Sequence, residues 1–113
     1  MSGLTSHVLD TAAGQPATGI EVTLAQRHQG EWRELASTTT DADGRTGDLW
    51  PAGRTMEPGT YRLRFAVGDY HRAQGVAGFY PWADVVFAVS DPAAHYHVPL
   101  LLSPYGYSTY RGS

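Results

Sequence analysis

The stretch that decides the fold class is YRLRFAV, residues 61–67, in which apolar and polar side chains alternate. The odd-numbered positions carry Tyr, Leu, Phe and Val, whereas residues 62 and 64 are arginines. Successive side chains of a β-strand point to opposite faces of a sheet. The pattern therefore predicts a strand with one buried face and one face that carries two guanidinium groups.

Alternating or short apolar stretches continue on both sides of this strand. We expect further strands at 4–9, 20–25, 32–39, 85–89 and 96–102, separated by turns rich in Gly, Pro, Asp and Ser. A short helix fits only residues 70–78, where Gly75 and Gly78 weaken it. Six to eight short strands at this spacing are typical of a β-sandwich. With 113 residues and no visible linker or repeat, we expect one domain spanning 1–113.

The composition excludes several kinds of chemistry. The chain has no Cys, no Lys and no Asn, and all 8 basic residues are Arg. Disulfides, thiolate metal sites, Schiff-base chemistry and Lys–Asn isopeptide crosslinks are therefore ruled out. A net charge of −3 argues against nucleic acid as a partner. No apolar run approaches the roughly 18 residues that span a membrane, and the opening MSGLTSH lacks signal-peptide features. We expect a cytoplasmic protein that does not bind membranes.

The expected strand at 96–102 has apolar groups on both faces. One face carries Tyr96 and three aliphatic residues, and the other carries His95, His97, Pro99 and Leu101. A solvated sheet face is normally more polar than this, which suggests that another subunit covers it. The simpler interpretation is a single exposed leucine, which is common.

Three residues outside the expected core have side chains suited to hydrolytic chemistry. His7 and His97 lie in strand-like stretches, and imidazole can act as a base near neutral pH. Arg45 follows an Asp-Gly turn, and its planar guanidinium suits paired oxygen atoms. Residues of these types, taken one at a time, are more often structural or surface groups. A metal site of His7, His95 and His97 is not favoured, because no carboxylate lies near them in sequence.

The C-terminal segment is unusually aromatic for a chain end. It carries three tyrosines between residues 105 and 110, followed by Arg111. Chain ends are usually disordered and polar. Two interpretations remain open: an edge strand whose tyrosines fill the side of the core, or a tail in which Tyr110, Arg111 and Ser113 line a pocket.

Four motifs together are shared with one known family. They are TSHVLDT at 5–11, DGR at 43–45, FYP at 79–81 and the terminal YRGS at 110–113. With them the whole chain resembles the 5-hydroxyisourate hydrolases of the transthyretin-like family. The last motif also separates these hydrolases from transthyretin, the hormone carrier of the same fold. Ser6 and Tyr80 are mild departures from the family pattern.

The resemblance implies an all-β fold, a prealbumin-like sandwich of two antiparallel sheets with about eight strands and one short helix. It implies a homotetramer, a dimer of dimers, with active sites at the dimer–dimer interface. The implied reaction is hydrolysis of 5-hydroxyisourate to 2-oxo-4-hydroxy-4-carboxy-5-ureidoimidazoline in urate catabolism, without cofactor or metal.

The resemblance also assigns site residues. The implied catalytic set is His7, Arg45, His97 and Ser113. Substrate binding is implied for Tyr110, Arg111 and Gly112. Either histidine could take a proton from water, and a fixed cation such as Arg45 would stabilise an oxyanion. The hydroxyl of Ser113 would contact substrate or water rather than act as a nucleophile, because no partner base is evident.

Two other functions compete with hydrolysis. A carrier of small aromatic molecules would share the fold and the tetramer, but it has no use for two histidines, an arginine and the YRGS end together. A prealbumin-like structural module would share the Gly, Pro and Asp turns. Many such modules are exported and some carry Lys–Asn crosslinks, which this composition forbids.

Overall fold

The predicted strand at 61–67 is confirmed as β6 (Gly59–Phe65), which lies inside a four-stranded antiparallel sheet, but it ends at Phe65, and Val67 begins the helix instead. The computed structural model describes residues 3–113. In this sheet the order is β5 (Glu31–Thr39), β4 (Glu21–His28), β6 and β7 (Ala83–Val89). The apolar side chains of β6 are fully buried and its arginines are not, so the alternation predicted the correct inner face.

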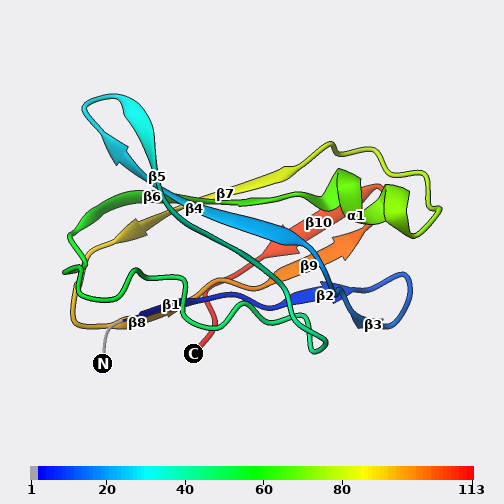
Figure 1. Cartoon of the computed structure of the whole chain (residues 1–113), viewed down its shortest axis with the longest axis horizontal. Coiled ribbons are helices and arrows are strands. Elements are labelled where there is room, and N and C mark those ends of the chain that lie inside the picture. The colour runs from blue at the N-terminus through cyan, green and yellow to red at the C-terminus, as the bar shows by residue number, and fades with distance from the viewer. Residues whose placement is uncertain (1–2) are drawn as a thin grey trace.

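A second layer of strands packs against this sheet (Figure 1). It contains a four-stranded sheet in the order β10 (Gly106–Thr109), β9 (Leu100–Ser103), β2 (Val8–Asp10) and β3 (Gln15–Pro16). The pair β1 (Gly3–Thr5) and β8 (His95–His97) continues along the same layer. The predicted sandwich is confirmed. The second layer is not purely antiparallel, however, because β1 pairs with β8 and β2 with β9 in parallel.

The predicted strands at 4–9 and 96–102 are each interrupted. The breaks fall at residues 6–7 and 98–99. Pro99 has no amide hydrogen and cannot donate to a strand ladder. The buried Ser6 hydroxyl instead donates to the carbonyl of Val98, at 2.7 Å. If each interrupted pair is counted as one strand, the ten strands become the eight expected.

The core fills the space between the two layers. Leu4, Val8, Leu100 and Leu102 of the second layer are buried against β4, β6 and β7. On the opposite face, Pro99 is already buried by the chain itself and Leu101 is half-buried. Cover of this outer face by another subunit therefore stays a prediction. The exposed apolar area that such a subunit would cover is smaller than the sequence suggested.

The single helix, α1, spans Val67–Ala73 and not 70–78. It begins earlier because Gly68 lets the backbone pass close to Pro81, where a Cβ atom would lie 2.6 Å from the carbonyl oxygen. The helix ties the two layers together, since the hydroxyl of Tyr70 donates to Asp10 at 2.7 Å. The polar sequence around His71 predicts a surface position for this histidine, but it follows Tyr70 in the helix and is buried. Across residues 3–113 we find no helix long and apolar enough to cross a membrane.

Candidate active site

The turn at residues 41–45 brings Arg45 beside the strand that carries His7. One carboxylate oxygen of Asp41 accepts the amide hydrogens of Asp43 at 2.9 Å and Arg45 at 3.0 Å. The bond from the Arg45 amide is the main cause of the lowered pKa of Asp41. Residue 44 is glycine with a φ of 76°, and a Cβ there would overlap the carbonyl oxygen of Val8. This close approach makes Arg45 the antiparallel bridge partner of His7.

The position of the ring hydrogen of His7 follows from its hydrogen bond. Nε2 of His7 lies 2.8 Å from the carbonyl oxygen of Asp43. A carbonyl only accepts hydrogen bonds, so Nε2 carries the hydrogen. In a neutral ring the lone pair is then on Nδ1.

His97 reaches the same region from the other end of the chain. It pairs with Thr5 across the parallel strands β1 and β8, and its Nδ1 lies 2.8 Å from the Thr5 hydroxyl. Burial lowers the pKa of His97, and the positive charges of Arg45, His7 and His95 lower it further. The neutral imidazole, which can accept a proton, is thereby favoured.

The C-terminal tail is held against His97. The amide of Gly112 donates to the carbonyl oxygen of His97 at 2.8 Å, which forms an isolated bridge. A Cβ atom at position 112 would lie only 2.5 Å from Cδ2 of the His97 ring. Glycine is required here because the tail backbone lies directly on the imidazole, and this contact delivers Ser113 to the site.

These elements surround one hollow of about 360 Å³ on the outer face of the second layer. Its lining combines a guanidinium, two imidazoles, a carboxylate and three hydroxyls: Thr5, Ser6, Asp41, Arg45, Gly47, His95, His97 and Ser113. Three of the four predicted catalytic residues thus share one hollow. The fourth, His7, borders it through its bridge to Arg45.

A family model described as the HIUase/Transthyretin family matches residues 4–112. The chain belongs to the HIUase/Transthyretin family. It is 51% identical to a 5-hydroxyisourate hydrolase of Caulobacter vibrioides over the full length of both chains. It is also 47% identical to a 5-hydroxyisourate hydrolase of Salmonella typhimurium, with 97% of this chain and 80% of the relative covered.

Solved structures of this family carry the same sandwich. The 5-hydroxyisourate hydrolase of Klebsiella pneumoniae matches with a TM-score of 0.84 and 34% identity, over 98% of this chain and 99% of the other. Sea bream transthyretin, solved in complex with thyroxine, matches with a TM-score of 0.89 and 33% identity, over 97% and 94% of the two chains. The likeness of fold therefore extends to a hydrolase and to transthyretin alike.

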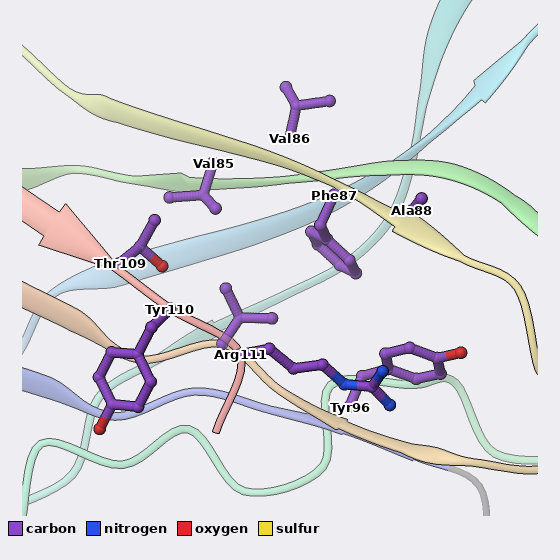
Figure 2. A pocket seen from close by; sticks show the side chains of 9 residues that line it. Val85, Val86, Phe87, Ala88, Tyr96, Thr109, Tyr110 and Arg111 are labelled. Carbon is purple, nitrogen blue, oxygen red and sulfur yellow. The ribbon is translucent and has the colours of Figure 1, made fainter. Parts of the chain in front are cut away.

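Two of the predicted substrate-binding residues lie outside the hollow that contains His97. Tyr110 and Arg111 line a second hollow of about 300 Å³ between β7 and the tail (Figure 2). The guanidinium of Arg111 lies 4.5 Å from the ring centroid of Tyr96, and the ring of Tyr110 is exposed. Within one chain neither residue lines the hollow of His97. Substrate binding by Tyr110 and Arg111 stays a prediction.

Five lining residues were not among the predicted catalytic and binding residues: Thr5, Ser6, Asp41, Gly47 and His95, the last of which the sequence suggested only as part of an unfavoured metal site. Two of them could have been predicted from the sequence. Strand alternation places Thr5 on the same face as His7, and an Asp that opens a turn, such as Asp41, commonly binds the amides that follow it. Only the pairing of β1 with β8 brings His95 to them. Among residues 3–113, no group of three or more His, Cys, Asp and Glu side chains could hold a metal ion.

Proposed function

We propose that this chain, with residues 1–113 as a single hydrolase domain, hydrolyses 5-hydroxyisourate to 2-oxo-4-hydroxy-4-carboxy-5-ureidoimidazoline. The convergence of Arg45, His97 and Ser113 on one hollow, beside His7, carries the proposal. The 51% identity to a full-length relative named for this activity supports it.

The reaction opens the six-membered ring of the substrate at the N1–C6 bond. A water molecule gives a proton to a base, and its oxygen bonds to C6. The C6–N1 bond then breaks, N1 takes up a proton, and a carboxylate and a ureido group remain. No electrons are transferred, so the proposal requires no redox cofactor, and water is the only co-reactant.

His97 is the better placed of the two histidines to act as the base. Its lowered pKa keeps the imidazole neutral at physiological pH. Its ring is fixed on one side by Thr5 and on the other by Gly112. Positioned general bases of this kind contribute about 10²–10⁴-fold to a rate.

Arg45 supplies the positive charge beside which the oxyanion develops, and His7 lies next to it. A guanidinium suits paired oxygen atoms through its planar fork of N–H donors, and the backbone of Arg45 is fixed by the Asp41 turn. The Nε2–H of His7 is held by the Asp43 carbonyl, which leaves Nδ1 to orient substrate or water. Loss of one such oxyanion-stabilising group costs about 10²–10³-fold in kcat. Ser113 adds a hydroxyl to the lining of the hollow. Substrate binding by Tyr110, Arg111 and Gly112 is proposed from the family resemblance alone, since Tyr110 and Arg111 line the second hollow within one chain.

Assembly into a homotetramer, a dimer of dimers, is part of the proposal. The strands β7 and β10 are edges of their sheets, and residues of β7 line one hollow together with Thr109 and Tyr110 at the end of β10. Val86 and Tyr110 beside these edges are 56% exposed, which favours pairing with a second copy. Light scattering tests the oligomeric state, with an expected mass of four times 12.3 kDa.

A cytoplasmic location is proposed as well, since a chain without Cys needs no oxidising compartment. Cell fractionation tests this location.

The decisive experiment measures ring opening directly. Urate oxidase generates 5-hydroxyisourate in situ, and the purified protein should accelerate the loss of its absorbance above the spontaneous rate. His7→Ala, Arg45→Ala and His97→Ala should each keep the fold and lose most of the activity. If the wild-type protein gives no acceleration, the hydrolase proposal fails.

A carrier function is the alternative with a specific observation behind it, the match to a thyroxine-bound transthyretin. A carrier would bind a urate analogue stoichiometrically and would release it unchanged. Calorimetry with such an analogue, beside the turnover assay, distinguishes the two: binding without turnover in a folded protein supports the carrier.

A further inference from the structure

The hydroxyl of Thr5 lies between two histidine rings. It is 2.8 Å from Nδ1 of His97 and 3.0 Å from Nε2 of His95. The parallel register of β1 and β8 pairs Thr5 with His97 and Gly3 with His95, so all three side chains share the outer face of the layer. The mechanism described above uses Thr5 only as a contact of the His97 ring and gives His95 no role.

The single hydroxyl hydrogen of Thr5 limits how the three side chains can bond. A threonine hydroxyl donates one hydrogen bond and accepts up to two. It can therefore donate to only one of the two rings, and at least one of Nδ1 of His97 and Nε2 of His95 must carry a hydrogen. Which ring donates decides which nitrogen of His97 holds the lone pair.

The proposed role of His97 as the base sets the direction of this chain of hydrogen bonds. Nδ1 of His97 lies against the Thr5 hydroxyl, so Nε2 is the ring nitrogen left to take a proton from water. In a neutral imidazole one nitrogen carries the hydrogen and the other carries the lone pair. A lone pair on Nε2 therefore places the hydrogen on Nδ1, which donates to the Thr5 oxygen, and the Thr5 hydroxyl donates to Nε2 of His95.

The free nitrogen of His97, Nε2, lies beside the tail. This nitrogen is bonded to Cδ2, the ring atom on which the tail backbone of Gly112 lies. Besides these residues, the charged groups that face His97 are Arg45 and His7, and Asp41 lines the same hollow.

We propose that Thr5 and His95 are positioning residues that hold His97 in the tautomer with hydrogen on Nδ1 and the lone pair on Nε2. The proposal rests on the proposed function for its effect on rate. Water gives its proton to Nε2. The Nδ1 hydrogen stays on His97 throughout, and the Thr5 oxygen stabilises the imidazolium by accepting a hydrogen bond from Nδ1–H.

The test compares Thr5→Val, which removes the hydroxyl at nearly constant shape, with Thr5→Ser, which keeps it. We expect Thr5→Val to lower kcat by about 10–100-fold, the range found when a partner that orients an active histidine is lost, with KM little changed. Thr5→Ser should stay within about threefold of wild type. Thr23→Val is the matched control, because Thr23 lies on the outer face of the other sheet and its hydroxyl faces only Ser37 at 3.4 Å.

The direction of the pH shift separates this arrangement from its reverse. If the Thr5 oxygen accepts from His97, the bond favours the imidazolium, and its loss lowers the pKa of His97. The acid limb of kcat/KM then moves to lower pH in Thr5→Val. A move to higher pH would mean that the hydroxyl donates to His97, and an unmoved limb would mean that Thr5 is structural only. Either result overturns the proposal.

A readout independent of activity is the tautomer itself. Long-range ¹H–¹⁵N correlation spectra of ¹⁵N-histidine-labelled protein should show His97 protonated on Nδ1 in the wild type, and a mixture of tautomers in Thr5→Val and His95→Phe. His28→Phe, at an exposed histidine of β4, should leave the His97 signals unchanged. A wild-type His97 protonated on Nε2 alone would refute the inference even if the enzyme is active. Failure of the hydrolase proposal would appear separately, as a wild type without turnover.

Discussion

Gly112→Ala should separate the role of the tail in positioning His97 from its role in stability. The added Cβ would lie 2.5 Å from Cδ2 and 3.3 Å from Cγ of the His97 ring. Carbon atoms in good contact lie about 3.5–4.0 Å apart. Since the Gly112 amide is bonded to the His97 carbonyl at 2.8 Å, either the ring or the tail must move by about 1 Å.

The cost to stability is small in either case. A ring turned about 30° from its rotamer costs about 0.5–1.5 kcal/mol, and a released tail loses one backbone hydrogen bond of similar worth. For a chain of this size about 1 kcal/mol lowers Tm by several degrees. The effect on rate is larger, because a displacement of about 1 Å at a catalytic group costs on the order of 10²-fold.

Gly106→Ala is the matched control. It lies in β10, a few residues earlier in the same C-terminal segment, and its Cβ would meet only Ser103 Oγ at an ordinary 3.7 Å. The assay is the absorbance decay of 5-hydroxyisourate generated by urate oxidase, with Tm measured on the same samples. We expect a kcat about 100-fold lower for Gly112→Ala and near wild type for Gly106→Ala. Wild-type kcat in Gly112→Ala, or equal losses in both variants, would refute the reasoning.

Three further predictions concern the turn, the pH dependence and the tail. Gly44→Ala places a side chain at a φ of 76° and against the Val8 carbonyl, so it should lower the free energy of unfolding by about 3 kcal/mol or more. Gly53→Ala, with a φ of 77° and open space around it, should cost only about 1–2 kcal/mol. Equal losses of the two variants in urea unfolding would show that the turn has room for a side chain. In the wild type, kcat/KM should hold at neutral pH and fall only as pH drops through the lowered pKa of His97, below 6.5, because protonation removes the base; a limb above 6.5 would contradict this. A bulky tag after Ser113 should reduce kcat more than the same tag at the N-terminus, whereas equal effects would remove the tail from the site.

The strands could be predicted because their signal is local. In β6 the alternation of residues 61–65 needs no knowledge of the partner strands, and the buried and exposed faces follow directly. The start of α1 could not be predicted in this way, because it depends on how closely Gly68 approaches Pro81, a contact between segments. The burial of His71 has the same origin, since its ring packs where a side chain on Gly78 would otherwise lie.

For the candidate site, the sequence predicts the residue types but not how they come together. The residue types were recognisable from short motifs, since a histidine in a strand and an arginine after an Asp-Gly turn carry their chemistry wherever the fold puts them. Their convergence was not predictable from periodicity. It depends on the parallel pairing of β1 with β8 and on the bridge between His7 and Arg45. Thr5 became a candidate only when that pairing placed its hydroxyl between two rings.

The tail links the two hollows through two adjacent residues of β8. Arg111 lies over the ring of Tyr96, and the next residue, Gly112, lies on His97. Within one chain these contacts are worth about 1–2.5 kcal/mol, the sum of an exposed cation–π pair and one backbone hydrogen bond. Ordering the backbone of residues 111–113 costs about 1–2 kcal/mol for each residue. The contacts of a single chain fall short of that cost, so a docked tail needs further contacts, and the proposed pairing of copies at the β7 and β10 edges would supply them beside Arg111. In that case assembly at the edge also holds Gly112 against His97.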